Sequence, residues 1–102
     1  MSVVVVAMLT PKPGQEDAVR EVLRAAVPEV HAEPGCELYA LHEEDGRLVL
    51  VEKWESAEAL AVHSRGEALK KMGGALRGLT DGASEIHRLS PLPAGDAAKG
   101  TV

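Results

Sequence analysis

The sequence predicts an α+β domain, with helices on one face of a four-stranded antiparallel sheet. Three observations lead to this class. Hydrophobic periodicity changes along the chain in the order strand, helix, strand, strand, broken helix, strand. The two middle strands are separated by Asp45-Gly46, a strong signal for a tight hairpin. The chain has 102 residues, which is enough for one hydrophobic core and too few for two.

The first part of the chain predicts a buried strand followed by an amphipathic helix. Residues 3–9 read VVVVAML, so this strand is apolar on both faces and should be covered on both. Residues 15–33 carry apolar side chains at helical spacing, with charged side chains on the other side. Pro28 lies inside this span and is expected to kink the helix or to split off its last turn. Pro34-Gly35 then ends it.

The second part predicts a hairpin, a broken helix and a last strand. The hairpin strands are residues 36–44 and 47–55, and side chains two apart share a face, so Glu52 and Trp54 point the same way. A short helix over residues 56–63 and a second piece over residues 67–79 follow, and residues 83–89 form the final strand. We therefore expect one domain over residues 1–90 and a loose, flexible C-terminal tail over residues 91–102.

This element order is that of the ferredoxin-like βαββαβ fold, which places both helices on one face of the sheet. The opposite face stays bare in a single copy, although the first and third strands are apolar there too. The cover we expect is the same face of a second copy, which predicts a homodimer and, from the two sheets together, a dimeric α/β barrel.

Composition excludes several partners. The net charge of −5, with no local Lys/Arg cluster, disfavours nucleic acid. The longest apolar run is too short to cross a membrane, and the N-terminus lacks the features of a signal peptide, so we expect a cytoplasmic protein with no membrane partner. His31, His42 and His87 show no ligand spacing, and the single Cys36 has no activating neighbour, so no metal is expected.

Three segments carry a resemblance to a known family: EPGCELY at residues 33–39, LVEKWES at residues 50–56 and ALAVH at residues 59–63. At this spacing the chain resembles the antibiotic biosynthesis monooxygenase family over essentially residues 3–89. The resemblance implies dimers of ferredoxin-like protomers with an apolar pocket between sheet and helices. It also implies oxidation of electron-rich phenols or quinols by O₂ with no cofactor, neither metal nor flavin.

One segment departs from that family. Relatives usually continue after the ALxxH sequence with Thr or Ser, Pro, His and an aromatic residue, whereas this chain reads SRGEA at residues 64–68. A second histidine and an aromatic side chain are therefore missing. The pocket wall is expected to differ here, and with it the substrate.

Two candidate catalytic residues follow from the sequence and the resemblance. His63 ends the short helix, and because imidazole titrates near neutral pH it could remove a phenolic proton. The alternative is a structural histidine at a helix C-terminus. Glu52 stands between apolar neighbours, where a carboxylate needs a partner. It could orient His63 or accept a substrate proton, or it could form a salt bridge between helix and sheet, which we favour.

Two candidate substrate-binding residues are the only large aromatic side chains of the chain. Trp54 could stack on a planar substrate as a pocket wall, or serve as a core or interface residue. Tyr39 could donate a hydrogen bond to a substrate oxygen, although cross-strand packing is the default role on its strand.

The leading hypothesis is a cofactor-independent monooxygenase that oxidises a small aromatic diol or quinol with O₂. His63 is the expected base, Trp54 the wall, and Tyr39 or Glu52 the polar anchor. Haem degradation by related proteins of this fold uses an Asn with a Trp and a His. The chain contains no Asn, so we disfavour this function. Two alternatives stay open: a proton-transfer isomerase that needs no O₂, and a non-catalytic dimeric module that binds an aromatic metabolite.

Overall fold

The computed structural model describes all residues, 1–102, and forms one sheet with three helices. In chain order the elements are β1 (Val3–Leu9), α1 (Glu16–His31), β2 (Cys36–Glu44), β3 (Arg47–Trp54), α2 (Ala57–Ser64), α3 (Glu67–Leu76) and β4 (Glu85–Leu89). The sheet order is β2-β3-β1-β4, and every neighbouring pair is antiparallel. The predicted ferredoxin-like fold is confirmed. None of the helices has the length and apolar character needed to cross a membrane.

The element boundaries differ from the predicted ones mainly where helices and the last strand end. The helix α3 stops at Leu76, three residues before the predicted end, and β4 begins at Glu85, two residues after the predicted start. The helix α1 continues past Pro28 through His31 and is not split. Proline removes only one backbone donor, so the burial of Val30 and its neighbours can hold the last turn in place.

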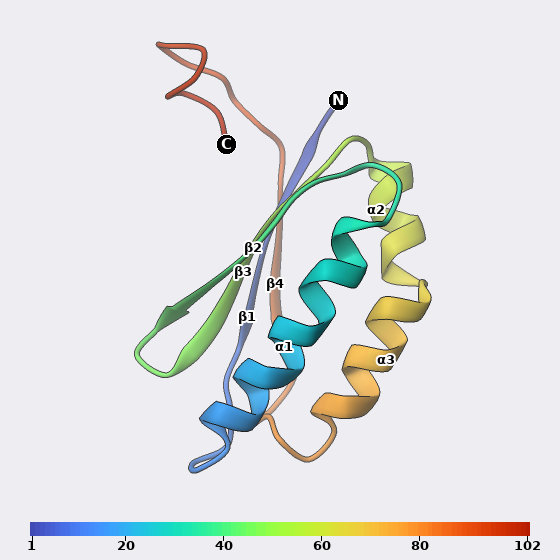
Figure 1. Cartoon of the computed structure of the whole chain (residues 1–102). Coiled ribbons are helices and arrows are strands. Elements are labelled where there is room, and N and C mark those ends of the chain that lie inside the picture. Colours follow the sequence, from blue (N-terminus) through green and yellow to red (C-terminus); the bar gives the residue numbers. More distant parts are fainter.

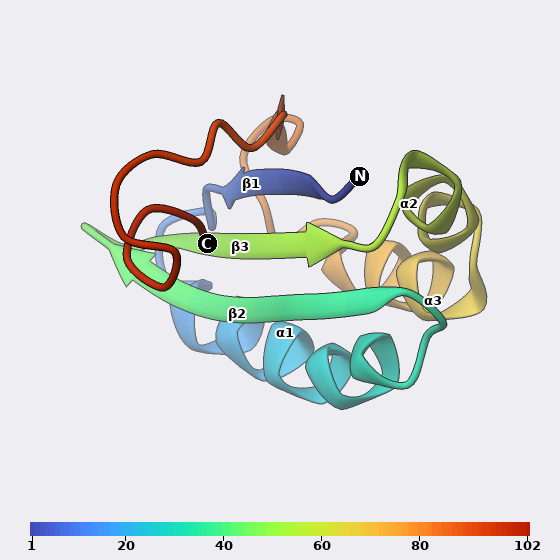
Figure 2. The same ribbon diagram turned by 90° about the horizontal axis from the view of Figure 1, so that it is seen from above.

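The hydrophobic core lies between the helices and one face of the sheet. Side chains two apart on each strand face this core, as the alternating burial of β3 shows. The helix α1 contributes Val19, Leu23, Ala26 and Val30, all at most 4% exposed. Figures 1 and 2 show all three helices on the same side of the sheet. The helix-facing side of the sheet is therefore where a site can be enclosed.

The outer face of the sheet has no helix over it. Its central strands present Val6, Met8, Val49 and Val51, which are only half-buried. Residues 91–102 contain no helix or strand, and they leave the sheet on the side away from the helices (Figure 1). The edge strand β4 is exposed at every residue, including Ile86 at 65%.

Candidate active site

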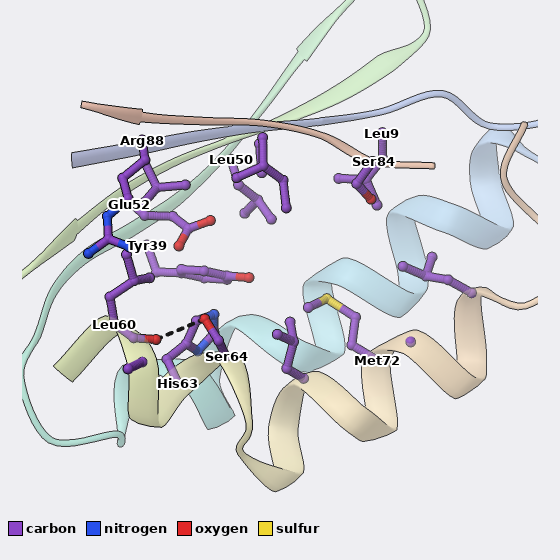
Figure 3. A pocket seen from close by; sticks show the side chains of 17 residues that line it. Leu9, Tyr39, Leu50, Glu52, Leu60, His63, Ser64, Met72, Ser84 and Arg88 are labelled. Carbon is purple, nitrogen blue, oxygen red and sulfur yellow. Dashed lines mark hydrogen bonds between the residues drawn. The ribbon is translucent and has the colours of Figure 1, made fainter. Parts of the chain in front are cut away.

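A half-open cavity of about 450 Å³ lies between the helix-facing side of the sheet and the helices α2 and α3. Eleven of its 17 lining residues are hydrophobic, and all four strands contribute to it. This volume is within the range of small-molecule sites. Figure 3 shows Tyr39, Glu52 and Arg88 toward one end of the cavity and Leu9, Ser84 and Met72 toward the other. The charged side chains of the lining thus lie at one, polar end, and the other end is mostly apolar.

His63 reaches the cavity from the last turn of α2. The helix is started by Ser56, whose hydroxyl accepts a hydrogen bond from the backbone N–H of Ala59 at 3.1 Å. Leu60 and His63 are three residues apart and therefore share the buried face of this short helix. His63 is 4% exposed and lines the cavity.

Glu33 holds the His63 ring in one orientation. The Nδ1 of His63 donates a hydrogen bond to Oε1 of Glu33 at 2.7 Å, between side chains that are 5% and 18% exposed. A carboxylate can only accept, so Nδ1 carries the hydrogen and the neutral ring has its lone pair on Nε2. Nε2 of His63 has no hydrogen-bond partner in the chain. Every side-chain nitrogen or oxygen without a partner is accessible to solvent, so Nε2 is accessible too. Because His63 lines the cavity, Nε2 opens into it.

The loop between α1 and β2 brings Glu33 to this histidine. Gly35 has a φ of +80°, which favours glycine, and its backbone carbonyl accepts a hydrogen bond from Glu55 N–H at 2.8 Å. A Cβ atom at Gly35 would come within 2.5 Å of the Cβ of Ala59 on α2. The glycine of the EPGC segment therefore lets the loop approach α2 closely enough for Glu33 to reach His63.

Trp54 supports His63 from behind rather than forming a wall of the cavity. Its side chain is fully buried and is absent from the cavity lining. Its ring stacks on the imidazole of His63, with centroids 4.4 Å apart and planes inclined by 28°. The expectation that Trp54 itself forms the substrate wall therefore does not match the lining, because His63 lies between this ring and the open space.

Glu52 is buried at the polar end of the cavity, at 4% exposure. Its Oε1 accepts a hydrogen bond from Nε1 of Trp54 at 3.0 Å, two residues further along the same face of β3. Burial raises the pKa of this carboxyl, opposed by the hydrogen bond from Trp54 and by the nearby His63. Glu52 forms no ion pair, so the favoured salt-bridge role is wrong, and the residue that orients His63 is Glu33.

Tyr39 approaches the same histidine from β2. Its ring meets that of His63 edge-on at a centroid distance of 5.6 Å. The hydroxyl makes no hydrogen bond within the chain and is not sealed from solvent, and the residue lines the cavity, so the hydroxyl is available to a ligand there (Figure 3). Burial raises the pKa of Tyr39, so this hydroxyl stays protonated and can donate a hydrogen bond.

The structure thus brings together all four residues predicted from the sequence and adds Glu33, to which no role was assigned. The segment that departs from the family pattern ends α2 and begins α3, and only Ser64 of it lines the cavity. No group of three or more His, Cys, Asp or Glu side chains has the arrangement of a metal site. A buried histidine that lines a mostly apolar cavity and is hydrogen-bonded to a half-buried glutamate is suited to accepting a proton from a bound organic molecule.

These features define a ferredoxin-like α+β protein with a buried histidine that lines a mostly apolar cavity. The sequence model of the antibiotic biosynthesis monooxygenase family matches residues 2–74. The chain belongs to this family. No functionally curated protein matches the chain significantly.

Solved structures show the same fold. Rv0793 from Mycobacterium tuberculosis is 30% identical, with a TM-score of 0.86, and the match covers 94% of this chain and 100% of that one. PA3566 from Pseudomonas aeruginosa is 28% identical, with a TM-score of 0.82 and coverages of 89% and 94%. An antibiotic biosynthesis monooxygenase at 23% identity has a TM-score of 0.82, with coverages of 89% and 99%, and shares the fold.

Proposed function

We propose that this protein is a monooxygenase that oxidises a small aromatic diol or quinol with O₂ at the cavity beside His63. The observation that carries the proposal is the imidazole of His63, fixed through Nδ1 by Glu33 and open to the cavity through Nε2. A family whose members include monooxygenases supports the reaction class.

The first step is removal of a phenolic proton by Nε2 of His63. The resulting phenolate is electron-rich, and the hydroxyl of Tyr39 donates a hydrogen bond to an oxygen of the same ring. Most of the residues that line the cavity are hydrophobic, and such surroundings strengthen each hydrogen bond to the developing anion. Glu33 stabilises the protonated imidazole that forms.

The second step joins the activated ring to O₂. A ring carbon with a replaceable hydrogen forms a C–O bond and becomes a hydroperoxide, and the O–O bond then breaks with loss of water. One oxygen atom enters the product, the other leaves as water, and the aromatic diol becomes a hydroxyquinone. The proton held by His63 goes to the departing oxygen. The substrate supplies all four electrons, so this route needs no electron-donating cofactor.

We also infer that the protein acts as a homodimer through the outer face of the sheet. Val6 and Val51 are cross-strand partners at the centre of that face, and both are only half-buried. A second copy presenting the same face would remove this apolar surface from water. A cytoplasmic location is part of the same proposal, because the single thiol, Cys36, suits a reducing compartment.

The proposal is tested with naphthalene-1,4-diol as the probe substrate and an oxygen electrode, after subtraction of the rate without protein. We expect O₂ uptake and a hydroxynaphthoquinone that carries one atom of isotopically labelled oxygen. His63→Gln should lower kcat by about a hundredfold or more, because general-base catalysis contributes on that scale. The control is His42→Gln, at an exposed histidine on β2, which should keep the rate.

Other outcomes would replace this function with another. Turnover that continues without O₂ would indicate the isomerase. Saturable binding with no turnover would indicate the binding module. Equal rates for the His63→Gln variant and the unmodified protein would refute the role given to the histidine.

A further inference from the structure

Arg88, an exposed residue of β4, borders the polar end of the cavity and carries the one permanent positive charge of its lining. No other Lys or Arg is among the residues that line the cavity. On β4 the alternation of side chains places Arg88 on the helix-facing side of the sheet, opposite Val5, and Val5 is in turn paired with Glu52 and Glu52 with Tyr39. Arg88 therefore completes one row across all four strands, at the end of the cavity where His63 and Tyr39 present polar atoms.

Arg88 has no partner within the chain. It forms no ion pair or hydrogen bond, whereas Arg20 and Arg47 are each paired with carboxylates. The nearest carboxyl in its row is that of Glu52, which is committed through Oε1 to the indole of Trp54. Burial raises the pKa of Glu52, and no hydrogen bond or ion pair joins its carboxyl to Arg88.

Arginine presents a planar set of donors that matches a carboxylate with two parallel hydrogen bonds. A ligand ring in the apolar part of the cavity, with a hydroxyl at His63, could direct an acidic substituent to this guanidinium. Figure 3 shows Arg88 on the same side of the cavity as Glu52, Tyr39 and Leu60.

We propose that Arg88 binds a carboxylate on the substrate, so that the pocket selects aromatic diols that carry an acidic group over their uncharged analogues. For the choice of an aromatic diol this inference rests on the proposed function. Arg88 is a specificity-determining residue here, and it takes no part in the transfer of protons or electrons.

A different role for Arg88 would be to protect an edge strand, since β4 is the exposed end of the sheet and charged side chains discourage edge-to-edge association. That role needs only the charge and is indifferent to what the cavity holds. The two roles therefore differ in one measurable respect, which is discrimination between ligands that differ only by a carboxylate.

The test compares naphthalene-1,4-diol with 1,4-dihydroxynaphthalene-2-carboxylate, by isothermal titration calorimetry without O₂. The protein should bind the carboxylate at least about tenfold more tightly, because hydrogen bonds between charged groups are worth roughly this factor or more. Arg88→Gln should abolish that preference, and added salt should weaken it in the unmodified protein. The control is Arg24→Gln, which removes the same charge from an exposed position on α1.

Preference for the carboxylate that is lost only in Arg88→Gln supports the inference. Equal affinities for the two ligands, a preference that survives Arg88→Gln, or no binding of either ligand would overturn it. Measurement of O₂ uptake separates this inference from the proposed function. Selective binding without O₂ uptake would refute the monooxygenase function and support the carboxylate site. O₂ uptake with equal kcat/KM for both diols, in the unmodified protein and in Arg88→Gln, would support the monooxygenase function and refute the carboxylate site.

Discussion

Replacement of Glu33 by Gln tests whether the Glu33–His63 contact serves chemistry or only folding. The substitution keeps the size of the side chain and removes its charge. An amide can turn either its oxygen or its nitrogen toward Nδ1 of His63, so it no longer fixes the tautomer that leaves the lone pair on Nε2. It also withdraws the negative charge that stabilises the imidazolium formed during the reaction.

The size of the effect follows from the geometry. The contact is 2.7 Å long and joins side chains that are 5% and 18% exposed, so it is a charge-assisted hydrogen bond with limited access for water. Such bonds contribute about 1.5–3 kcal/mol. If the transition state loses this amount, kcat falls by about tenfold to a hundredfold. Because Glu33 does not line the cavity, KM should change little.

The assay is the initial rate of O₂ uptake at several substrate concentrations, accompanied by urea unfolding of each variant. Glu58→Gln is the matched control, because Glu58 is an exposed carboxylate on α2 that has no ion pair. A fall in kcat at constant KM, in a folded variant, is the expected result. An unchanged kcat, or a loss of activity that only follows a loss of stability, would refute the positioning role of Glu33.

Three further predictions concern pH, packing and assembly. Because burial raises the pKa of Glu52, the folded state loses stability as pH rises through that pKa. In urea unfolding, Glu52→Gln should therefore gain stability relative to the unmodified protein between about pH 4 and pH 8. A stability difference that stays constant over this range would contradict the prediction. Gly35→Ala should lower the free energy of unfolding by about 2 kcal/mol or more, because Gly35 has a positive φ and no space for a Cβ atom. Gly46→Ala is the control and should lower it by about 1 kcal/mol, because Gly46 also has a positive φ but open space around it. Equal losses in thermal unfolding would refute the close approach of the Gly35 loop to α2. Val51→Lys should shift the protein from dimer to monomer in sedimentation at micromolar concentration. The control is Val62→Lys, at an exposed position on α2, which should leave the dimer intact. A dimer that persists in Val51→Lys would contradict assembly through the outer face of the sheet.

The fold was predictable because its signals are local. The apolar run of β1, the Asp45-Gly46 turn and the alternation along β3 each fix a strand from a few neighbouring residues. The boundaries that differ lie where local signals conflict. In α3 the helical spacing of apolar residues extends to Leu79, but the chain turns at Gly78, whose φ is +80°. In α1 the proline predicts a break, and tertiary packing overrides it.

Part of the candidate site was predictable from local patterns and from the family resemblance, which pointed to His63. Alternation along β3 places Glu52 and Trp54 on one face, and the sheet register then brings Tyr39 beside them. The partner of His63 could not be found in this way, because Glu33 lies 30 residues away, in a loop with no periodicity. Its position depends on how closely that loop approaches α2, which the absence of a Cβ at Gly35 permits.

The resemblance of the EPGC segment to a family singled out Glu33 and Gly35 but gave no physical reason for them. The glycine sets the distance between loop and helix, and the glutamate two residues earlier then orients the base. The two carboxylates of the site differ in their burial and in their hydrogen-bond partners. Glu33 is half-buried and accepts a hydrogen bond from Nδ1 of His63, whereas Glu52 is buried and accepts one from Nε1 of Trp54, and burial raises the pKa of the Glu52 carboxyl. Only Glu33 is hydrogen-bonded to the imidazole, so the loss of activity should be larger in Glu33→Gln than in Glu52→Gln, even though Glu52 lines the cavity and Glu33 does not.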